Sequence, residues 1–200
     1  YKRQAKQMPI SIEKMQSFKE NLPFKLTNAQ ERTIKEISED ISLAKPMRRL
    51  VQGDVGSGKT VVAAMSMYIS AKNNSQSVLL CPTEVLAEQH FKNFSAWFKN
   101  LNIKIELLTG KMPISKRRGI YQDLENGEID ILIGTHAVFQ EKVKMKNLGL
   151  VVVDEQQRFG VKQRFDLVKK SSDQIMPHQL FMTATPVSYT HLTLPTSRSV

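Results

Sequence analysis

Eight consecutive residues of this sequence have the composition and spacing of a phosphate-binding loop. They match the pattern G-x-x-x-x-G-K-[ST] and read Gly53, Asp54, Val55, Gly56, Ser57, Gly58, Lys59 and Thr60. The glycines let the backbone curl so that successive N–H groups face phosphate oxygens. Lys59 adds a positive charge toward the β- and γ-phosphates, and the Thr60 hydroxyl can ligate Mg²⁺. The competing interpretation is a flexible Gly-Ser turn before a lysine, but an apolar strand precedes the loop and a helix-forming run follows it.

A pair of carboxylates, Asp154 and Glu155, directly follows the apolar run Val151–Val153. Enzymes with a phosphate loop use an acid at the end of another core strand to hold the hydration shell of Mg²⁺. Asp154 is therefore the predicted Mg²⁺ partner, and Glu155 is predicted to orient and deprotonate an attacking water. Alone, such a pair is an ordinary solvated loop start. Together with the phosphate loop it predicts ATP and Mg²⁺ as cofactors, with Lys59, Asp154 and Glu155 as catalytic residues.

These groups need a sheet to position them, and short apolar runs alternate with helical patterns from Arg48 onward. The predicted strands are Arg49–Gln52, Ser77–Cys81, Ile103–Leu108, Asp130–Gly134, Leu150–Val153 and Gln179–Met182. The predicted helices between them are Lys59–Ala71, Thr83–Asn100, Ser115–Asn126 and Gln163–Lys170. This alternation predicts an α/β fold with a doubly wound parallel sheet. Val151–Val153, apolar on both faces, is typical of a central strand.

The domain organisation follows from where this pattern begins and ends. Residues 1–24 are polar, basic and interrupted by prolines, and are predicted to be a linker with a short helix from a preceding domain. Residues 25–186 form the main domain, and its first helix begins at Thr27, with Gln30 placed for a capping box. Residues 187–200 are rich in Ser and Thr and are expected to be a non-native or disordered tail. His90, Phe94 and Trp97 have core-like spacing on one helix and are expected to pack.

Composition bounds the class of protein. The 200 residues are 40% hydrophobic and 24% charged, which is ordinary for a globular domain. The net charge of +10 favours a polyanionic partner such as nucleic acid, with a merely soluble basic protein as the alternative. The single cysteine, Cys81, cannot form an internal disulfide and fits a reducing cytoplasm. No stretch approaches the roughly 18 apolar residues of a membrane span, and the first residues lack the apolar core of a signal peptide.

Beyond these features, an ordered set of motifs resembles the first motor domain of superfamily 2 helicases, and most closely the RecG type of branch-migrating DNA helicase. The motifs are Leu22-Pro23-Phe24-Lys25-Leu26-Thr27, Gly53–Thr60, Pro82-Thr83-Glu84, Thr109-Gly110, Gly134-Thr135-His136, Asp154-Glu155-Gln156-Gln157 and Thr183-Ala184-Thr185-Pro186. The resemblance runs from about residue 1 to Pro186 and implies a RecA-like domain. The motor of the transcription-repair coupling translocase is the nearest alternative.

The resemblance implies a role for individual residues. Gln30 would read the adenine, although it is also a capping-box partner, and Phe24 would stack near the base, although a buried anchor is equally compatible. The DNA backbone would be contacted by residues that are also ordinary caps and turns, namely Pro82, Thr83, Glu84, Thr109, Gly110, Thr135 and His136. Coupling between nucleotide and DNA would involve Gln157, Thr183 and Thr185. Gln157 departs from the family pattern, which usually has His there.

The implied activity is an ATP-dependent DNA helicase that couples hydrolysis to branch migration and fork remodelling in recombination and repair, in a bacterial-type cytoplasm. Such helicases hydrolyse ATP between two RecA-like domains, and the second domain supplies an arginine. That domain and an N-terminal wedge are expected to be missing here, so weak nucleotide binding and poor turnover are expected. An ATP-sensing nucleic-acid-binding module without unwinding is the alternative from another class. A metabolic kinase is disfavoured by the acidic pair and by Thr183–Pro186.

Overall fold

The computed structural model describes residues 4–53, 58–154, 175–184 and 197–199, together with Asp166 and Lys169. Its centre is a seven-stranded sheet in the order β3-β4-β2-β5-β6-β1-β7. The strands are β1 (Arg48–Gly53), β2 (Gln76–Leu80), β3 (Ile105–Leu108), β4 (Ile131–Gly134), β5 (Leu148–Asp154), β6 (His178–Ala184) and β7 (Ser197–Ser199). Every pairing is parallel, which confirms the predicted α/β fold.

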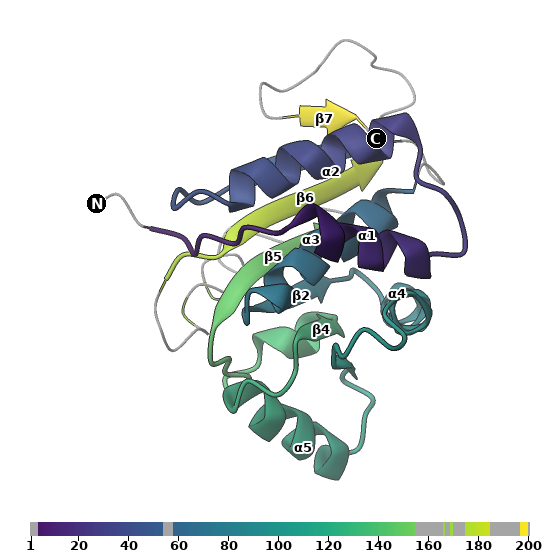
Figure 1. Ribbon diagram of the computed structural model, residues 1–200. Coiled ribbons are helices and arrows are strands. Elements are labelled where there is room, and N and C mark those ends of the chain that lie inside the picture. Colours follow the sequence, from purple (N-terminus) through teal and green to yellow (C-terminus); the bar gives the residue numbers. More distant parts are fainter. Residues whose placement is uncertain are drawn as a thin grey trace.

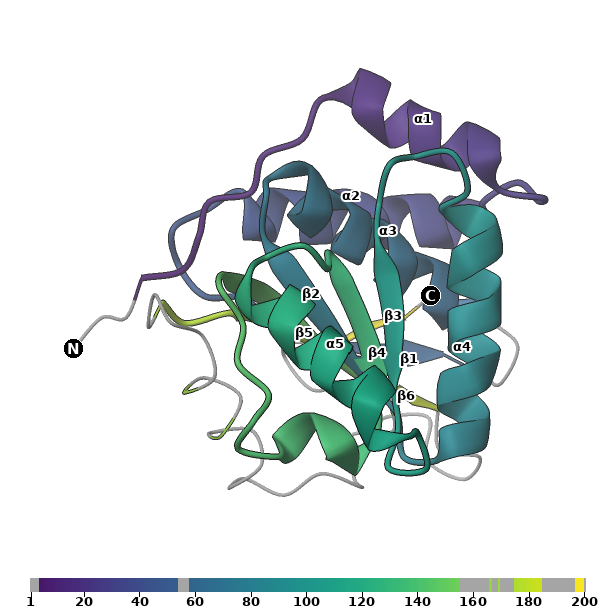
Figure 2. The ribbon, with the colours of Figure 1, turned by 90° about the horizontal axis from the view of Figure 1, so that it is seen from below.

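Helices cover both faces of this sheet (Figures 1 and 2). They are α1 (Ile12–Asn21), α2 (Asn28–Ile41), α3 (Lys59–Lys72), α4 (Glu84–Trp97), α5 (Ile114–Glu125) and the short 3-10 helix η1 (His136–Phe139). The six predicted strands and the helices α3, α4 and α5 are confirmed, with shifts of a few residues at their ends. The predicted helix Gln163–Lys170 lies almost entirely outside the described residues.

The alternation of side chains along the strands creates two apolar cores, one on each face. On β5, Leu150 and Val152 face the core that is shared with α1, α2, α3 and α4. Val151 and Val153 face the core that is shared with α5 and η1. β5 is therefore buried on both faces, as predicted for a central strand.

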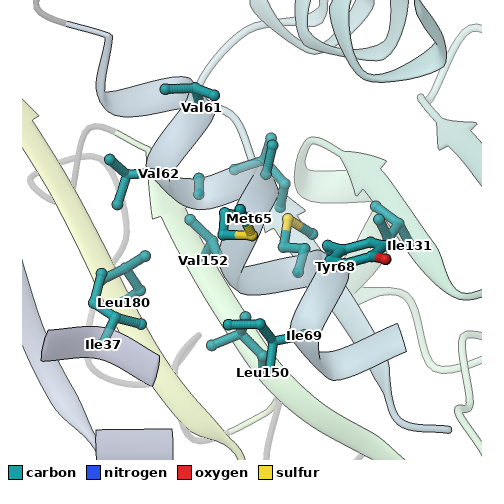
Figure 3. Packing of buried hydrophobic residues seen from close by; sticks show 14 of the residues in the cluster. Ile37, Val61, Val62, Met65, Tyr68, Ile69, Ile131, Leu150, Val152 and Leu180 are labelled. Atoms are coloured by element: carbon teal, nitrogen blue, oxygen red, sulfur yellow. The ribbon is translucent and has the colours of Figure 1, made fainter. Parts of the chain in front are cut away.

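Helix α3 is the most deeply buried helix among the described elements. Every residue from Val61 to Ala71 is buried, although most helices of a domain keep one face in water. Figure 3 shows its apolar side chains packed beside Ile37 of α2 and strand residues such as Val152 and Leu180. Because Lys59 is the first residue of α3, this packing fixes the direction and position of the helix end that follows the phosphate loop.

The N-terminal segment is part of the same core. Phe18 of α1 is fully buried, and its ring lies 5.2 Å from that of Tyr68 and 5.0 Å from that of Phe98. The Tyr68 hydroxyl donates a hydrogen bond to the Lys14 carbonyl at 2.9 Å. Residues 1–24, predicted above to be a linker with a short helix, thus contain apolar residues that cover α3.

At the other end of the chain, β7 pairs with β1 at the edge of the sheet.

His178, the first residue of β6, ties together three parts of the chain. The Met47 backbone N–H donates to its Nδ1 at 2.9 Å, and its Nε2 donates to the Lys6 carbonyl at 2.7 Å. This pattern requires the neutral imidazole, because Nδ1 accepts. Burial lowers the pKa of His178 and outweighs the opposing effects of the Lys6 carbonyl and the Asp40 charge.

In the part of the chain that the structure describes, no helix is long and apolar enough to cross a membrane.

Replacing Phe18 with Ala should lower the free energy of unfolding by about 3–5 kcal/mol, because it leaves a cavity beside the rings of Tyr68 and Phe98. Urea denaturation of the chain measures this. Ile12→Ala is the control, since Ile12 on the same helix is 85% exposed and its loss should cost under about 0.5 kcal/mol. Equal effects of the two substitutions would show that α1 does not belong to the core.

The free energy of unfolding should fall as the pH drops below about 6.5. In this range His178 binds a proton in the unfolded chain but stays neutral in the folded chain, where its pKa is lowered. One histidine contributes at most about 1.4 kcal/mol per pH unit. His178→Gln replaces the imidazole with an amide, which can donate and accept hydrogen bonds but cannot titrate. The loss of stability of this variant between pH 7.5 and 5.5 should therefore be smaller. Parallel pH curves for the two proteins would contradict this assignment.

Candidate nucleotide site and nucleic-acid track

The candidate site lies where the carboxyl ends of the parallel strands meet. Gly53, the last residue of β1, is paired with Ala184 of β6, and Asp154, the last residue of β5, is paired with Met182 of β6. The phosphate-loop strand and the acidic strand are thus separated by one strand only. Such an edge is where open α/β sheets bind their ligands.

The start of α3 is built to receive an anion. Its N-cap is Gly58, which has a φ of +82° and provides no side-chain cap, and the first turn contains no acidic residue. A Cβ on Gly58 would overlap Nε2 of Gln30, so both the backbone angle and the space require glycine. Lys59 Nζ donates to the Gly53 carbonyl at 2.8 Å, which holds the ammonium at the end of β1. A helix start without a side-chain cap, a helix dipole and a lysine fit a phosphate group. Asp54, Val55, Gly56 and Ser57 lie outside the described residues.

Gln30 connects the phosphate loop to α2. The predicted capping box is present: Gln30 N–H donates to Thr27 Oγ1 at 3.1 Å, and Thr27 N–H donates to Gln30 Oε1 at 2.9 Å. Nε2 of Gln30 also donates to the Gly58 carbonyl at 3.4 Å.

Phe24 is 42% exposed and meets the Trp97 ring edge-on at 5.8 Å, so it is not a buried anchor. It lines an open pocket of about 630 Å³ together with Leu26 and Glu31. Adenine recognition by Gln30 and Phe24 stays a prediction.

Asp154 meets a partner that the sequence does not reveal. Its Oδ2 lies 3.0 Å from Nε2 of His90 on α4, and both side chains are largely buried. Nδ1 of His90 has no hydrogen-bond partner among the described residues, so the ring proton belongs on Nε2, where it is donated to the carboxylate. Burial, and secondarily the charge of Asp154, raise the pKa of the nearby Cys81 thiol and keep it neutral.

The donor set suits Mg²⁺ bound together with phosphates. Within the described ranges, no group of three His, Cys, Asp or Glu side chains is arranged to hold a metal ion by itself. One hydroxyl, Thr60, and one carboxylate, Asp154, are the ligands expected for an ion that keeps waters and takes its other ligands from a nucleotide. Glu155, the predicted water-activating residue, is outside the described residues.

The predicted DNA contacts follow three neighbouring strands, β3, β4 and β2, so their loops lie along one edge. Thr83 caps α4 by accepting from the Leu86 N–H at 3.2 Å, and the neighbouring Pro82 lies at the same strand end. Glu84 pairs with Lys111 at 3.3 Å, which offsets its negative charge. Gly110 and His136 are exposed, whereas Thr109 and Thr135 are buried.

Close packing holds two of these loops together. A Cβ on Gly134 would come within 2.7 Å of the Leu108 carbonyl, so the ends of β3 and β4 can approach only with glycine there.

Thr183, a predicted coupling residue, is half-buried at the end of β6, and its hydroxyl lies 3.5 Å from the Ala184 carbonyl. The other two, Gln157 and Thr185, lie outside the described residues.

Comparison with known proteins agrees with this geometry. Residues 27–192 match the model of the DEAD/DEAH box helicase family, a match that extends past Pro186. The chain belongs to the DEAD/DEAH box helicase family. The RecA-like domain implied by the motifs is thereby confirmed.

Among members of this family, the RecG proteins are closely similar. The ATP-dependent DNA helicase RecG of Aquifex aeolicus (strain VF5) is 50% identical over 171 residues, which cover 86% of this chain and 22% of that protein. RecG of Synechocystis sp. (strain ATCC 27184 / PCC 6803 / Kazusa) is 49% identical over 178 residues, which cover 89% of this chain and 21% of that protein. The structure of RecG bound to a three-way DNA junction is similar with a TM-score of 0.81 and 42% identity, over 92% of this chain and 24% of that chain.

These findings confirm the resemblance to RecG-type helicases over most of the chain. The chain spans less than a quarter of the length of the two RecG proteins named above.

Replacing Gly58 with Ala should weaken binding of ADP with Mg²⁺ by about tenfold or more, because the added methyl group displaces Gln30 and strains the helix start. Isothermal titration calorimetry measures the affinity. Gly119→Ala is the matched control, since a Cβ at this position on α5 meets nothing within 4 Å. If both variants bind like the unmodified chain, the α3 terminus is not the phosphate site.

Proposed function

We propose that this chain is the ATP-binding motor domain of a RecG-like DNA helicase, which couples ATP hydrolysis to branch migration and fork remodelling in recombination and repair. The observation that carries the proposal is that α3 starts at Lys59 and Thr60 without a side-chain cap, while β5, which ends at Asp154, lies one strand away from β1, which leads into the phosphate loop. The names of the similar RecG proteins support the same activity.

The nucleotide site works through a small number of groups. Backbone N–H groups at the start of α3 bind the β- and γ-phosphates of ATP, and Lys59 exchanges the Gly53 carbonyl for phosphate oxygens. Thr60 and Asp154 would hold a hydrated Mg²⁺, which would offset the negative charge that develops during phosphoryl transfer. Glu155 orients the attacking water. Gln30 and Phe24 contact the adenine, and the pocket beside Phe24 gives the ring room to dock.

The nucleic-acid track binds DNA through its backbone. Helix N-termini and hydroxyl groups at strand ends are good phosphate ligands and carry little sequence information. The start of α4 at Thr83 and the exposed Gly110 and His136 fit this use. The net charge of +10 favours a polyanion, and the RecG structure with a three-way junction makes branched DNA the proposed partner.

The proposal includes the setting in which the motor works. In P-loop enzymes, an arginine that reaches the γ-phosphate accelerates hydrolysis by about 10³–10⁵. We expect this arginine to come from a second RecA-like domain, with Gln157, Thr183 and Thr185 coupling the nucleotide to DNA. A bacterial-type cytoplasm is the proposed location.

Replacing Lys59 with Ala in the full-length protein should abolish DNA-stimulated ATP hydrolysis, with a loss of at least about 100-fold, because the charge at the β- and γ-phosphates is removed. Phosphate release measured with and without a three-way DNA junction tests this. Lys45→Ala is the control, since Lys45 is exposed before the opposite end of β1. Normal turnover by Lys59→Ala would contradict the proposed function.

A further inference from the structure

We propose that His90 is a positioning residue for Asp154. Its Nε2–H holds one carboxylate oxygen, so that the other oxygen faces the hydrated Mg²⁺ of the nucleotide site. This inference rests on the proposed function, because it assigns a role toward the same metal. It concerns a histidine whose spacing along α4 indicates only core packing.

The geometry is specific to one atom pair. Nε2 of His90 lies 3.0 Å from Oδ2 of Asp154, a distance typical of an N–H···O hydrogen bond. The side chains are only 10% and 14% exposed. Water therefore competes little with this bond, and its electrostatic strength is greater than at the surface.

The chemistry of the ring sets the direction of the bond. Nδ1 of His90 is buried without a partner among the described residues, so a proton on Nδ1 would have no hydrogen-bond acceptor. The neutral ring with its proton on Nε2 avoids this loss and donates to the carboxylate. In this assignment Oδ1, the oxygen that does not accept from His90, accepts from a water bound to Mg²⁺.

The surrounding packing holds His90 in place. Ala87 and Phe94, one turn before and one turn after it on α4, are fully buried. The same helix begins at Glu84, capped by Thr83, at the proposed nucleic-acid track. One rigid helix thus carries both a track residue and the partner of the Mg²⁺ ligand. A group that orients a metal ligand typically changes metal affinity by about 10–100-fold when it is removed.

The test is the effect of Mg²⁺ on nucleotide affinity, which requires no turnover. Isothermal titration calorimetry of ADP against the 200-residue chain, with Mg²⁺ and with EDTA, gives the ratio of the two affinities. His90→Phe and His90→Asn remove the bond, the first by losing the donor and the second because its amide reaches only the position of Nδ1. His90→Gln restores an amide near the position of Nε2.

We expect His90→Phe and His90→Asn to reduce the Mg²⁺ enhancement by about tenfold while the affinity in EDTA is unchanged, and His90→Gln to recover most of it. Asp154→Asn should remove the enhancement, and adding His90→Phe to it should have no further effect. A merely structural role would lower both affinities together.

The inference is overturned if His90→Phe and His90→Asn are folded and both keep a normal Mg²⁺ enhancement of ADP affinity. It is also overturned if His90→Gln loses as much of this enhancement as they do. Both results would leave the proposed function intact. If the unmodified chain shows no Mg²⁺-dependent binding, the proposed function fails, and the inference fails with it.

Discussion

The burial of helix α3 is the constraint on which the rest of the structure depends. A helix that is buried on all sides needs cover on all sides, and the core around α3 takes side chains from α1, α2, α4 and the sheet, some of which Figure 3 shows. The enclosed helix cannot shift without opening the core. Its first residue, Lys59, and the N–H groups beside it are therefore held at a fixed place above the strand ends, as an anion site requires.

The parallel register gathers the remaining groups at that place. Because every described strand pair is parallel, the residues that follow each strand reach the same edge although they are far apart in the sequence. Placing β6 between β1 and β5 sets the end of β1, which leads into the phosphate loop, and Asp154 on either side of one strand. Placing β4 between β3 and β2 aligns the three loops of the proposed track. The same topology thus positions both the proposed nucleotide site and the proposed nucleic-acid track.

Much of this arrangement could be predicted from the sequence, because local patterns encode it. The phosphate-loop motif, the capping box at Thr27 and the apolar run of β5 each depend on neighbours along the chain. The strand β3 begins later than predicted, at Ile105, because Asn102 adopts a φ of +57° and the Lys104 N–H bonds to the Asp130 carboxylate at 2.9 Å. The burial of Phe18 and the bond between His90 and Asp154 depend on contacts between distant segments, and no local pattern marks them.

The central claim is that the start of α3 and the end of β5 form a site for a nucleotide with Mg²⁺. A crystal structure of this chain with ADP and Mg²⁺ tests it most directly. The account predicts the β-phosphate within hydrogen-bond distance of the backbone N–H groups of Lys59 and Thr60, with Mg²⁺ between Thr60 and Asp154. A nucleotide bound away from this edge of the sheet, with no contact to α3, would contradict it.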